Sequence, residues 1–462
     1  MRGLLAALLL VPALAAAELP GPVRDALARA GVPESAVGAV VEPVAAGPRL
    51  VAHQAARPLN PASVIKLVTT FAGLDLLGPA YTFKTDVLVT GEVAGGSLAG
   101  DLVLRGGGDP KFTYERLWQL VRQLRSRGLR EIRGDVILDR SFFAPAAYDP
   151  AKFDGESRRA YNVGPDALLV NFKAIDFHFV PDGGGVRVVG EPDFPNVQIA
   201  SRVRLGHEPC NSWRHGLRYE VEEKGLLATV VFSGTYPADC GEKAWPLSVF
   251  DPDRYAEAAF RWIWSETGGR FTGRVRPGTT PANASLFLRF ESEPLAALVR
   301  DINKYSNNVM ARQLFLTLSA QKTGAPGEAA ASERIVREWL SAKGIATPGL
   351  VLENGAGLSR SERISAESLA ALLRAAWASP VMPELVSSLS LFAVDGTFKS
   401  RNGAFAGQAH LKGGTLTGVQ AVAGYVLDAK GERWVVVMLV NHDNANRAQG
   451  ALDALVDWTW RR

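Results

Sequence analysis

The stretch NPASVIKLVTT, residues 60–70, places a serine and a lysine three residues apart at the predicted start of a helix, with Asn60 as its N-cap. Ser63 would lie in the first turn, where a backbone N–H has no intrahelical acceptor and can donate to an oxyanion. Lys66 would share the same helix face, and burial would favour its neutral form, which can accept the Ser63 proton. The pair alone fits a nucleophile with its base, and it equally fits a capped helix with a surface lysine, so the rest of the chain must decide.

Two further elements of the same chemistry follow along the chain. Ser306 and Asn308 form a Ser-x-Asn sequence, in which the serine can relay a proton and the asparagine can hydrogen-bond a substrate amide. Lys412 is followed by two glycines and a threonine and opens a predicted strand hairpin. A strand edge can pair with a substrate backbone, so residues 412–415 are the predicted third element.

Each element also has a competitor. A second Ser-x-x-Lys pair occurs at Ser319 and Lys322, a literal Lys-Thr-Gly occupies residues 322–324, and a second Ser-x-Asn spans residues 400–402 in a Gly-rich turn. The Lys-Thr-Gly chemistry needs a strand, whereas residues 322–324 follow a predicted helix and precede a loop. We therefore favour Lys412 over the literal Lys-Thr-Gly.

Together these elements resemble the low-molecular-mass class C penicillin-binding proteins, the D-alanyl-D-alanine carboxypeptidase/endopeptidase family S13. Ser306 follows Ser63 by 306 − 63 = 243 residues, a gap longer than in β-lactamases. Residues 104–110 (LRGGGDP), 352–360 (LENGAGLSR) and 394–401 (VDGTFKSR) also look like signatures of that family. The resemblance implies an α/β fold, in which a serine β-lactamase/transpeptidase-like core of antiparallel sheet and helices carries a large β-rich insertion.

The resemblance also implies roles for individual residues. Ser63 would attack the D-Ala carbonyl carbon. The other catalytic residues would be Lys66, Ser306, Asn308 and Lys412.

Substrate contacts are implied in the same way. The backbone N–H groups of Ser63 and Thr415 would form the oxyanion hole, and the substrate would contact Gly413, Gly414, Thr415 and Arg360. Gly413 departs from the family pattern, which has threonine or serine after the lysine, so a hydroxyl expected near the substrate carboxylate is missing.

Charged side chains could also bind ionised groups of the stem peptide. Arg360 is a candidate for binding a carboxylate. Asp154 or Glu156 could meet an ammonium group.

The N-terminus predicts export. Arg2 precedes an apolar run at residues 4–16 that ends in small residues, so residues 1–17 are predicted to be a signal peptide. The mature chain is expected to be periplasmic and to lack a transmembrane anchor.

Export also bears on the two cysteines, Cys210 and Cys240. An oxidising compartment favours a disulfide between them. The neighbouring His207 and His215 leave a Cys/His metal site as the alternative, although their spacing fits no common zinc pattern.

The predicted secondary structure changes twice along the chain, from strands and helices to short strands and back. Residues 18–84 and 285–462 are predicted to form one discontinuous catalytic domain of strands and helices. Residues 85–284 contain short alternating strands separated by turn residues, and we expect an inserted β-rich region of two nested domains.

These features predict a periplasmic serine DD-peptidase that hydrolyses D-Ala-D-Ala termini, D-Ala–diamino acid cross-links, or both, and is inhibited by penicillin. The expected partners are peptidoglycan stem peptides and β-lactam antibiotics. A net charge of +4 is too small to indicate nucleic acid, whereas a pI near 9.0 is compatible with weak association with a membrane surface. A serine mechanism requires no metal or cofactor, and none is expected.

Two alternatives stay open. One is a catalytically weakened peptidoglycan-binding protein, for which Gly413 is the main argument. The other is a β-lactamase, although no Glu-x-x-Leu-Asn deacylation element occurs in the sequence.

Overall fold

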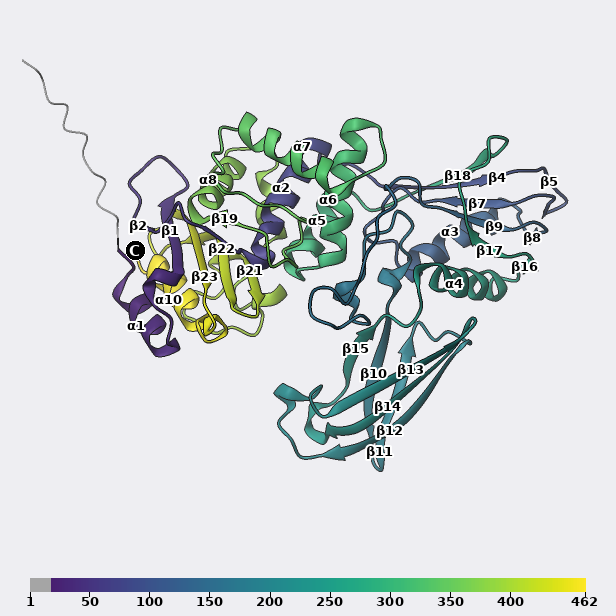
Figure 1. Ribbon diagram of the computed structural model, residues 1–462, viewed down its shortest axis with the longest axis horizontal. Helices are drawn as coiled ribbons and strands as arrows, with labels where there is room; N and C mark the ends of the chain where they lie inside the picture. The colour runs from purple at the N-terminus through teal and green to yellow at the C-terminus, as the bar shows by residue number, and fades with distance from the viewer. Residues whose placement is uncertain (1–17) are drawn as a thin grey trace, which may run out of the picture.

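The computed structural model describes residues 18–462, so the predicted signal peptide at residues 1–17 lies outside the described residues. One half of the molecule is built on a six-stranded antiparallel sheet (Figure 1). In spatial order its strands are β2 (Val51–His53), β1 (Val37–Pro43), β23 (Arg433–Asn441), β22 (Val419–Leu427), β21 (Ala409–Leu416) and β20 (Ser390–Leu391).

The central strands of this sheet are buried on both faces because helices cover both sides. In β23, Val436, Met438 and Val440 pack toward α1 (Gly21–Ala30) and α10 (Gln449–Trp460). The alternate residues of the same strand belong to the apolar cluster on the other face, with α2 (Lys66–Leu77) and α8 (Ala366–Trp377). This arrangement explains why the sequence of β23 is a continuous apolar run rather than an alternating one.

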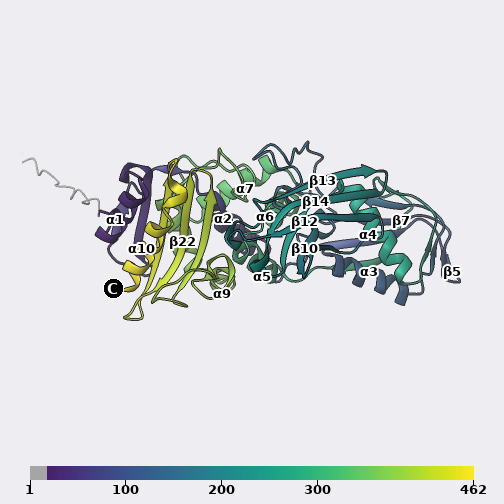
Figure 2. The ribbon, with the colours of Figure 1, turned by 90° about the horizontal axis from the view of Figure 1, so that it is seen from below.

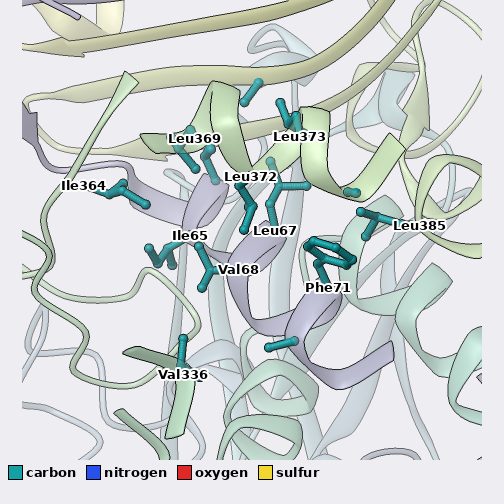
Figure 3. Close-up of a cluster of buried hydrophobic side chains, with 14 of the residues drawn as sticks. Ile65, Leu67, Val68, Phe71, Val336, Ile364, Leu369, Leu372, Leu373 and Leu385 are labelled. Carbon is teal, nitrogen blue, oxygen red and sulfur yellow. The ribbon is translucent and has the colours of Figure 1, made fainter. Parts of the chain in front are cut away.

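Helix α2 runs through the interior of the helical layer. Its residues from Lys66 to Leu74 are all buried, and its apolar side chains extend around the helix, as expected for a helix enclosed on every side. Figure 3 shows Leu67, Val68 and Phe71 packed among side chains of the surrounding helices. The other helices of this layer are α5 (Leu295–Lys304), α6 (Asn308–Thr323), α7 (Ala329–Ala342) and α9 (Met382–Ser388).

The chain between α2 and α5 forms the second half of the molecule, which lies beside the first along the long axis (Figures 1 and 2). Its first part has helices α3 (Tyr114–Ser126) and α4 (Pro252–Glu266) and two sheets. One sheet contains, in order, β17 (Val275–Pro277), β9 (Val136–Asp139), β7 (Leu102–Arg105), β4 (Lys84–Val89) and β18 (Ser285–Glu291). The other contains β16 (Arg270–Phe271), β8 (Glu131–Ile132), β6 (Ser97–Leu98) and β5 (Val93–Ala94).

The second part of the insertion consists of two three-stranded sheets. The first contains β11 (Gly185–Glu191), β10 (Ile175–Asp182) and β15 (Lys243–Leu247), and the second contains β12 (Val197–Gly206), β14 (Leu227–Pro237) and β13 (Leu217–Lys224). One cluster of buried apolar side chains extends through both parts. We therefore propose that the two parts are nested subdomains of one insertion.

The α/β core with a large β-rich insertion is confirmed, but one boundary needs correction. Strand β18, residues 285–291, pairs with β4 in the inserted sheet, so the insertion extends to Glu291 rather than ending at residue 284. The pairing joins segments about 200 residues apart, and a strand pattern alone does not reveal such a partner.

The predicted disulfide between Cys210 and Cys240 is formed. Both cysteines are therefore used by this bond. Within residues 18–462, none of the helices is long and apolar enough to cross a membrane.

Candidate active site

Ser63 lies in a tight turn at the beginning of the central helix. The turn, η2 (Ala62–Ile65), is a 3₁₀ turn that leads directly into α2, rather than the α-helical first turn expected. Asn60 Oδ1 accepts the Ala62 N–H at 2.9 Å, and Ala62 has φ 46°, in the left-handed region. Asn60 thus caps this turn locally instead of serving as a standard α-helix N-cap.

A residue that sequence reasoning missed holds Asn60 in place. Asn441, at the end of β23, accepts the Asn60 N–H at 2.7 Å and donates from Nδ2 to the Asn60 carbonyl at 3.0 Å. This two-way amide clamp attaches the serine turn to the central sheet.

Lys66 is fully buried beside Ser63. Its Nζ lies 2.9 Å from Ser63 Oγ, 2.7 Å from Asn308 Oδ1 and in hydrogen-bond contact with the Ala356 carbonyl. Burial lowers the pKa of Lys66 well below its usual value, and the nearby Lys412 charge lowers it further. A neutral amine can donate its two N–H groups to the Asn308 and Ala356 oxygens and direct its lone pair at the Ser63 hydroxyl.

Lys412 and Ser306 form a second lysine–serine contact in the site. Lys412 Nζ is 2.9 Å from Ser306 Oγ and 2.7 Å from the Gly413 carbonyl. Burial lowers the pKa of Lys412 to about 7. Ser306 has φ 55° in the short link between α5 and α6, where Asn307 caps α6 by accepting the Met310 N–H at 3.0 Å.

Strand β21 carries the predicted third element past the serine turn. Strand β20 pairs with β21 only at His410 and Leu411, so the edge from Lys412 onward faces η2. A Cβ atom at Gly414 would lie 2.6 Å from the Pro61 carbonyl oxygen. Only glycine permits this close approach of strand and turn.

The other two residues of the third element, Gly413 and Thr415, lie next to residues outside the serine turn. Thr415 is exposed and pairs with Gln420 of β22, with its Oγ1 3.3 Å from Gln420 Oε1. A Cβ atom at Gly413 would lie 3.2 Å from two ring carbons of Phe398. Gly413 therefore belongs to a contact that the sequence did not reveal.

The floor of the site is a loop, residues 353–357, that supplies the Ala356 carbonyl to Lys66. Gly357 has φ 82°, and a Cβ atom there would lie 2.1 Å from the Ala62 carbonyl oxygen. Thr69 Oγ1 of α2 donates to the Gly355 carbonyl at 2.7 Å. The segment that resembled a family signature thus has a physical role in supporting the lysine.

Arg360 lies at the far end of β21. Its Nη1 donates to the Thr417 carbonyl at 2.9 Å, and its guanidinium lies 4.7 Å from the Phe153 ring centre. Asp154 accepts from the Tyr161 hydroxyl at 2.8 Å, whereas Glu156 pairs with Arg159 in the same loop. Arg360 is thus close to β21, and its neighbour Phe153 comes from the inserted half.

The two halves of the molecule share a hollow beside Ser306. Its volume is about 350 Å³, and residues of the insertion such as Tyr161 and Asn171 line it together with Ser306 and Asn308. Tyr161, whose hydroxyl donates to Asp154, is therefore one of the residues of the insertion that line this hollow.

The competing motifs lie in other settings. Ser319 is buried in α6, where its hydroxyl accepts the Glu328 N–H at 2.9 Å, and Lys322 is exposed in the last turn of that helix. Residues 322–324 form the helix end, with Gly324 at φ 69°. Residues 400–402 lie in the loop between η7 (Gly396–Phe398) and β21.

The chain is similar to known proteins over most of its length. The family model described as D-Ala-D-Ala carboxypeptidase 3 (S13) matches residues 21–461. A D-alanyl-D-alanine carboxypeptidase of Actinomadura sp. (strain R39) is 28% identical over 438 residues, which cover 92% of this chain and 81% of that protein.

Solved structures show the same fold. Penicillin binding protein 4 (dacB) from Haemophilus influenzae has a TM-score of 0.78 at 22% identity, covering 95% of this chain and 99% of that one. A complex of that protein with a β-lactam has a TM-score of 0.73 at 22% identity, with the same coverage. Since the family match extends over nearly all the described residues, this chain belongs to the D-Ala-D-Ala carboxypeptidase 3 (S13) family.

Proposed function

We propose that the protein is a serine DD-peptidase that hydrolyses D-Ala-D-Ala-type bonds in peptidoglycan stem peptides through an acyl-enzyme on Ser63. The observation that carries this proposal is the fully buried Lys66, whose Nζ lies 2.9 Å from Ser63 Oγ and is held by Asn308 and the Ala356 carbonyl. Family membership supports the same activity.

Acylation begins at Ser63. The Oγ atom attacks the carbonyl carbon of the penultimate D-Ala while its proton moves to the Lys66 Nζ lone pair. The electrons of the carbonyl bond move to oxygen, and the backbone N–H groups of Ser63 and Thr415 are the proposed donors to that oxyanion.

Collapse of the tetrahedral intermediate breaks the C–N bond. The proton that Lys66 accepted passes through Ser306 to the leaving amine, which returns Lys66 to its neutral form, and Lys412 holds the Ser306 hydroxyl at 2.9 Å. Water then attacks the ester carbonyl carbon while neutral Lys66 takes its proton, and Lys66 returns that proton to Ser63 Oγ as the ester bond breaks. The products are a shortened stem peptide and either D-alanine or the released cross-linked strand.

Substrate recognition follows from the placement of the remaining residues. The edge of β21 at residues 412–415 would pair with the peptide backbone, and Asn308 would bind a substrate amide. Arg360 and Asp154 are the proposed contacts for a carboxylate and an ammonium of the stem peptide. We infer that cleavage of cross-links and inhibition by penicillin follow from the same acylation, and that the enzyme acts in the periplasm.

A fluorescent penicillin and defined muropeptides test this proposal. We expect mass spectrometry to locate the penicilloyl adduct on Ser63, and muropeptide products to lose a terminal D-Ala or a cross-link. Lys66→Ala should slow acylation by about 10²-fold or more, because the base is gone. The matched control is Lys322→Ala, which removes the lysine of the competing motif and should acylate normally.

The alternatives give different outcomes. An adduct on Ser319, or an unlabelled protein that still binds peptidoglycan, would contradict the proposal. Rapid steady release of penicilloate would instead indicate a β-lactamase.

A further inference from the structure

A buried carboxylate, which the reaction itself does not use, supports the loop beneath Lys66. Glu362 Oε1 accepts the backbone N–H groups of Glu353, Asn354 and Gly355 at 3.0–3.1 Å. Its Oε2 atom is also buried and has no hydrogen-bond partner among the described residues. The three bonds fix the residues directly before Ala356, whose carbonyl contacts Lys66.

A buried cation lies on the neighbouring helix. Arg312 is 4% exposed and follows Asn308 by one turn of α6. Its Nη1 donates to the Tyr148 hydroxyl at 2.6 Å and to the Val163 carbonyl at 3.0 Å, while its Nε is buried without a partner among the described residues. Arg312 and Glu362 form no ion pair with each other within the part of the chain that the structure describes, since their hydrogen bonds go to other groups.

We propose that Glu362 and Arg312 are positioning residues of opposite charge that bias the proton equilibrium of Lys66 in opposite directions. The inference rests on the proposed role of Lys66 as the base. A buried carboxylate favours the ammonium form of a nearby lysine, whereas a buried guanidinium favours the neutral amine. Their fields act strongly because few water molecules can screen charges in such a site.

The other groups around Lys66 are consistent with this balance. The charged groups that act on it are Lys412 of β21, Glu362 of the loop before β19 (Ile364–Ser365) and Arg312 of α6. Burial lowers the pKa of Lys66 most, the Lys412 and Arg312 charges lower it further, and Glu362 opposes them.

Three backbone N–H donors favour the ionised form of Glu362. All three hydrogen bonds go to Oε1, and a carboxylate oxygen accepts them more strongly than a neutral acid does. Burial raises the pKa of Glu362 and the three donors oppose that shift.

The test is the pH dependence of acylation by a fluorescent penicillin, measured as rate constants from pH 5 to 10. Glu362→Gln keeps an oxygen for the three N–H donors but removes the charge. In this variant the acid limb of the pH–rate profile, where the acylation rate rises with pH, should move to lower pH by about 0.5–1 unit. The reason is that Lys66 then loses its proton more easily. Arg312→Gln should move the limb to higher pH by a similar amount, and the double variant should lie near the unmodified protein.

Two controls separate charge from structure. Arg312→Lys keeps the charge and should leave the acid limb in place. Asp139→Asn changes another buried carboxylate that accepts backbone N–H groups, from Ser141 and Thr280, in the insertion. It should lower thermal stability without moving the limb.

The outcomes are distinguishable. Opposite shifts in the two single variants support the inference. Unchanged limbs, or shifts in the same direction, overturn it while leaving Ser63 acylation intact. Failure of the unmodified protein to be acylated would instead contradict the proposed function.

Discussion

At the scale of single residues, the ring of Phe398 accounts for a glycine at position 413. The Phe398 ring is 5% exposed, and its ring carbons would lie 3.2 Å from a Cβ atom at Gly413. The segment before Phe398 is fixed by an ion pair between Lys304 and Asp395. The ring therefore crowds the position of β21 where the family pattern has threonine or serine. A side chain with a hydroxyl fits there only if the Phe398 ring moves.

This contact leads to a prediction about penicillin acylation. A threonine hydroxyl at position 413 would donate a charge-assisted hydrogen bond to the penicillin carboxylate, which contributes roughly 1.5–3 kcal/mol or about tenfold or more in rate. We expect Gly413→Thr alone to gain little, because the tight contact with Phe398 opposes it. In a Phe398→Leu background the same substitution should speed acylation by about tenfold.

Stopped-flow rates on the four proteins of this double-mutant cycle measure the effect, with a penicillin and its carboxyl amide as reagents. Equal gains in both backgrounds would show that Phe398 does not restrict the position. A gain that persists with the amide would show that the hydroxyl acts on something other than the carboxylate.

At the scale of secondary-structure elements, the site depends on how closely the 353–357 loop approaches the serine turn. Gly357 has φ 82° and no space for a Cβ atom next to Ala62. A side chain there must displace either the serine turn or the loop that supplies the Ala356 carbonyl. Both displacements separate Lys66 from one of its hydrogen-bond partners.

We therefore predict that Gly357→Ala slows penicillin acylation by about 10²-fold or more, since small misplacements of catalytic groups are costly. The matched control is Gly128→Ala, at φ 92° with no atom within 4 Å of the added Cβ. Both variants carry the strain of a positive φ, but only the first should lose acylation. Comparable rate losses in the two variants would attribute the effect to backbone strain alone.

The sequence predicted those parts of the site that depend on local spacing. Ser63 and Lys66 are three residues apart, so their side chains meet even though Ser63 lies in the 3₁₀ turn before α2, and strand context favours Lys412 over Lys322. Asn441 and Glu362 could not be predicted, because an asparagine at a strand end and a glutamate in a loop are usually exposed. Only tertiary packing brings them to the backbone groups that they bind.

In the fold, too, single elements could be predicted from local sequence patterns, whereas the pairing of segments far apart in the chain could not. The alternating strands of the insertion and the helices around the core are visible as sequence periodicities. The pairing of β18 with β4 is not, since the two strands are about 200 residues apart and each reads as an ordinary strand. The domain boundary was therefore misplaced by one strand.

At the scale of the whole molecule, the insertion helps to build the site. The inserted half extends away from the catalytic half in both views (Figures 1 and 2). The hollow beside Ser306 is nevertheless lined by seven of its residues, Ala160, Tyr161, Asn171, Phe172, Ala174, Asp176 and Pro246. Phe153 also reaches back to Arg360 near the end of β21. The two halves thus meet where we propose that the stem peptide binds.

Burial of the Lys412 amine lowers the free energy of unfolding of the whole molecule. Lys412 is fully buried, and burial lowers its pKa from 10.5 to about 7. Between those two pH values the unfolded chain holds a proton on this side chain that the folded protein has released. Stability from this group therefore rises with pH across that window, and the penalty is largest below about pH 7.

We predict that Lys412→Met abolishes acylation but stabilises the fold most strongly at low pH. Methionine fills a similar volume without an amine to desolvate, so below about pH 7 the gain should be roughly 3–5 kcal/mol, less the lost hydrogen bonds to Ser306 and Gly413. The gain should shrink as the pH rises toward 10.5. Calorimetric unfolding temperatures at pH 6, 8 and 10 measure this trend, and Lys322→Met, which changes an exposed lysine, is the control. A gain that is equal at all three pH values would mean that desolvation of Lys412 is not its cause.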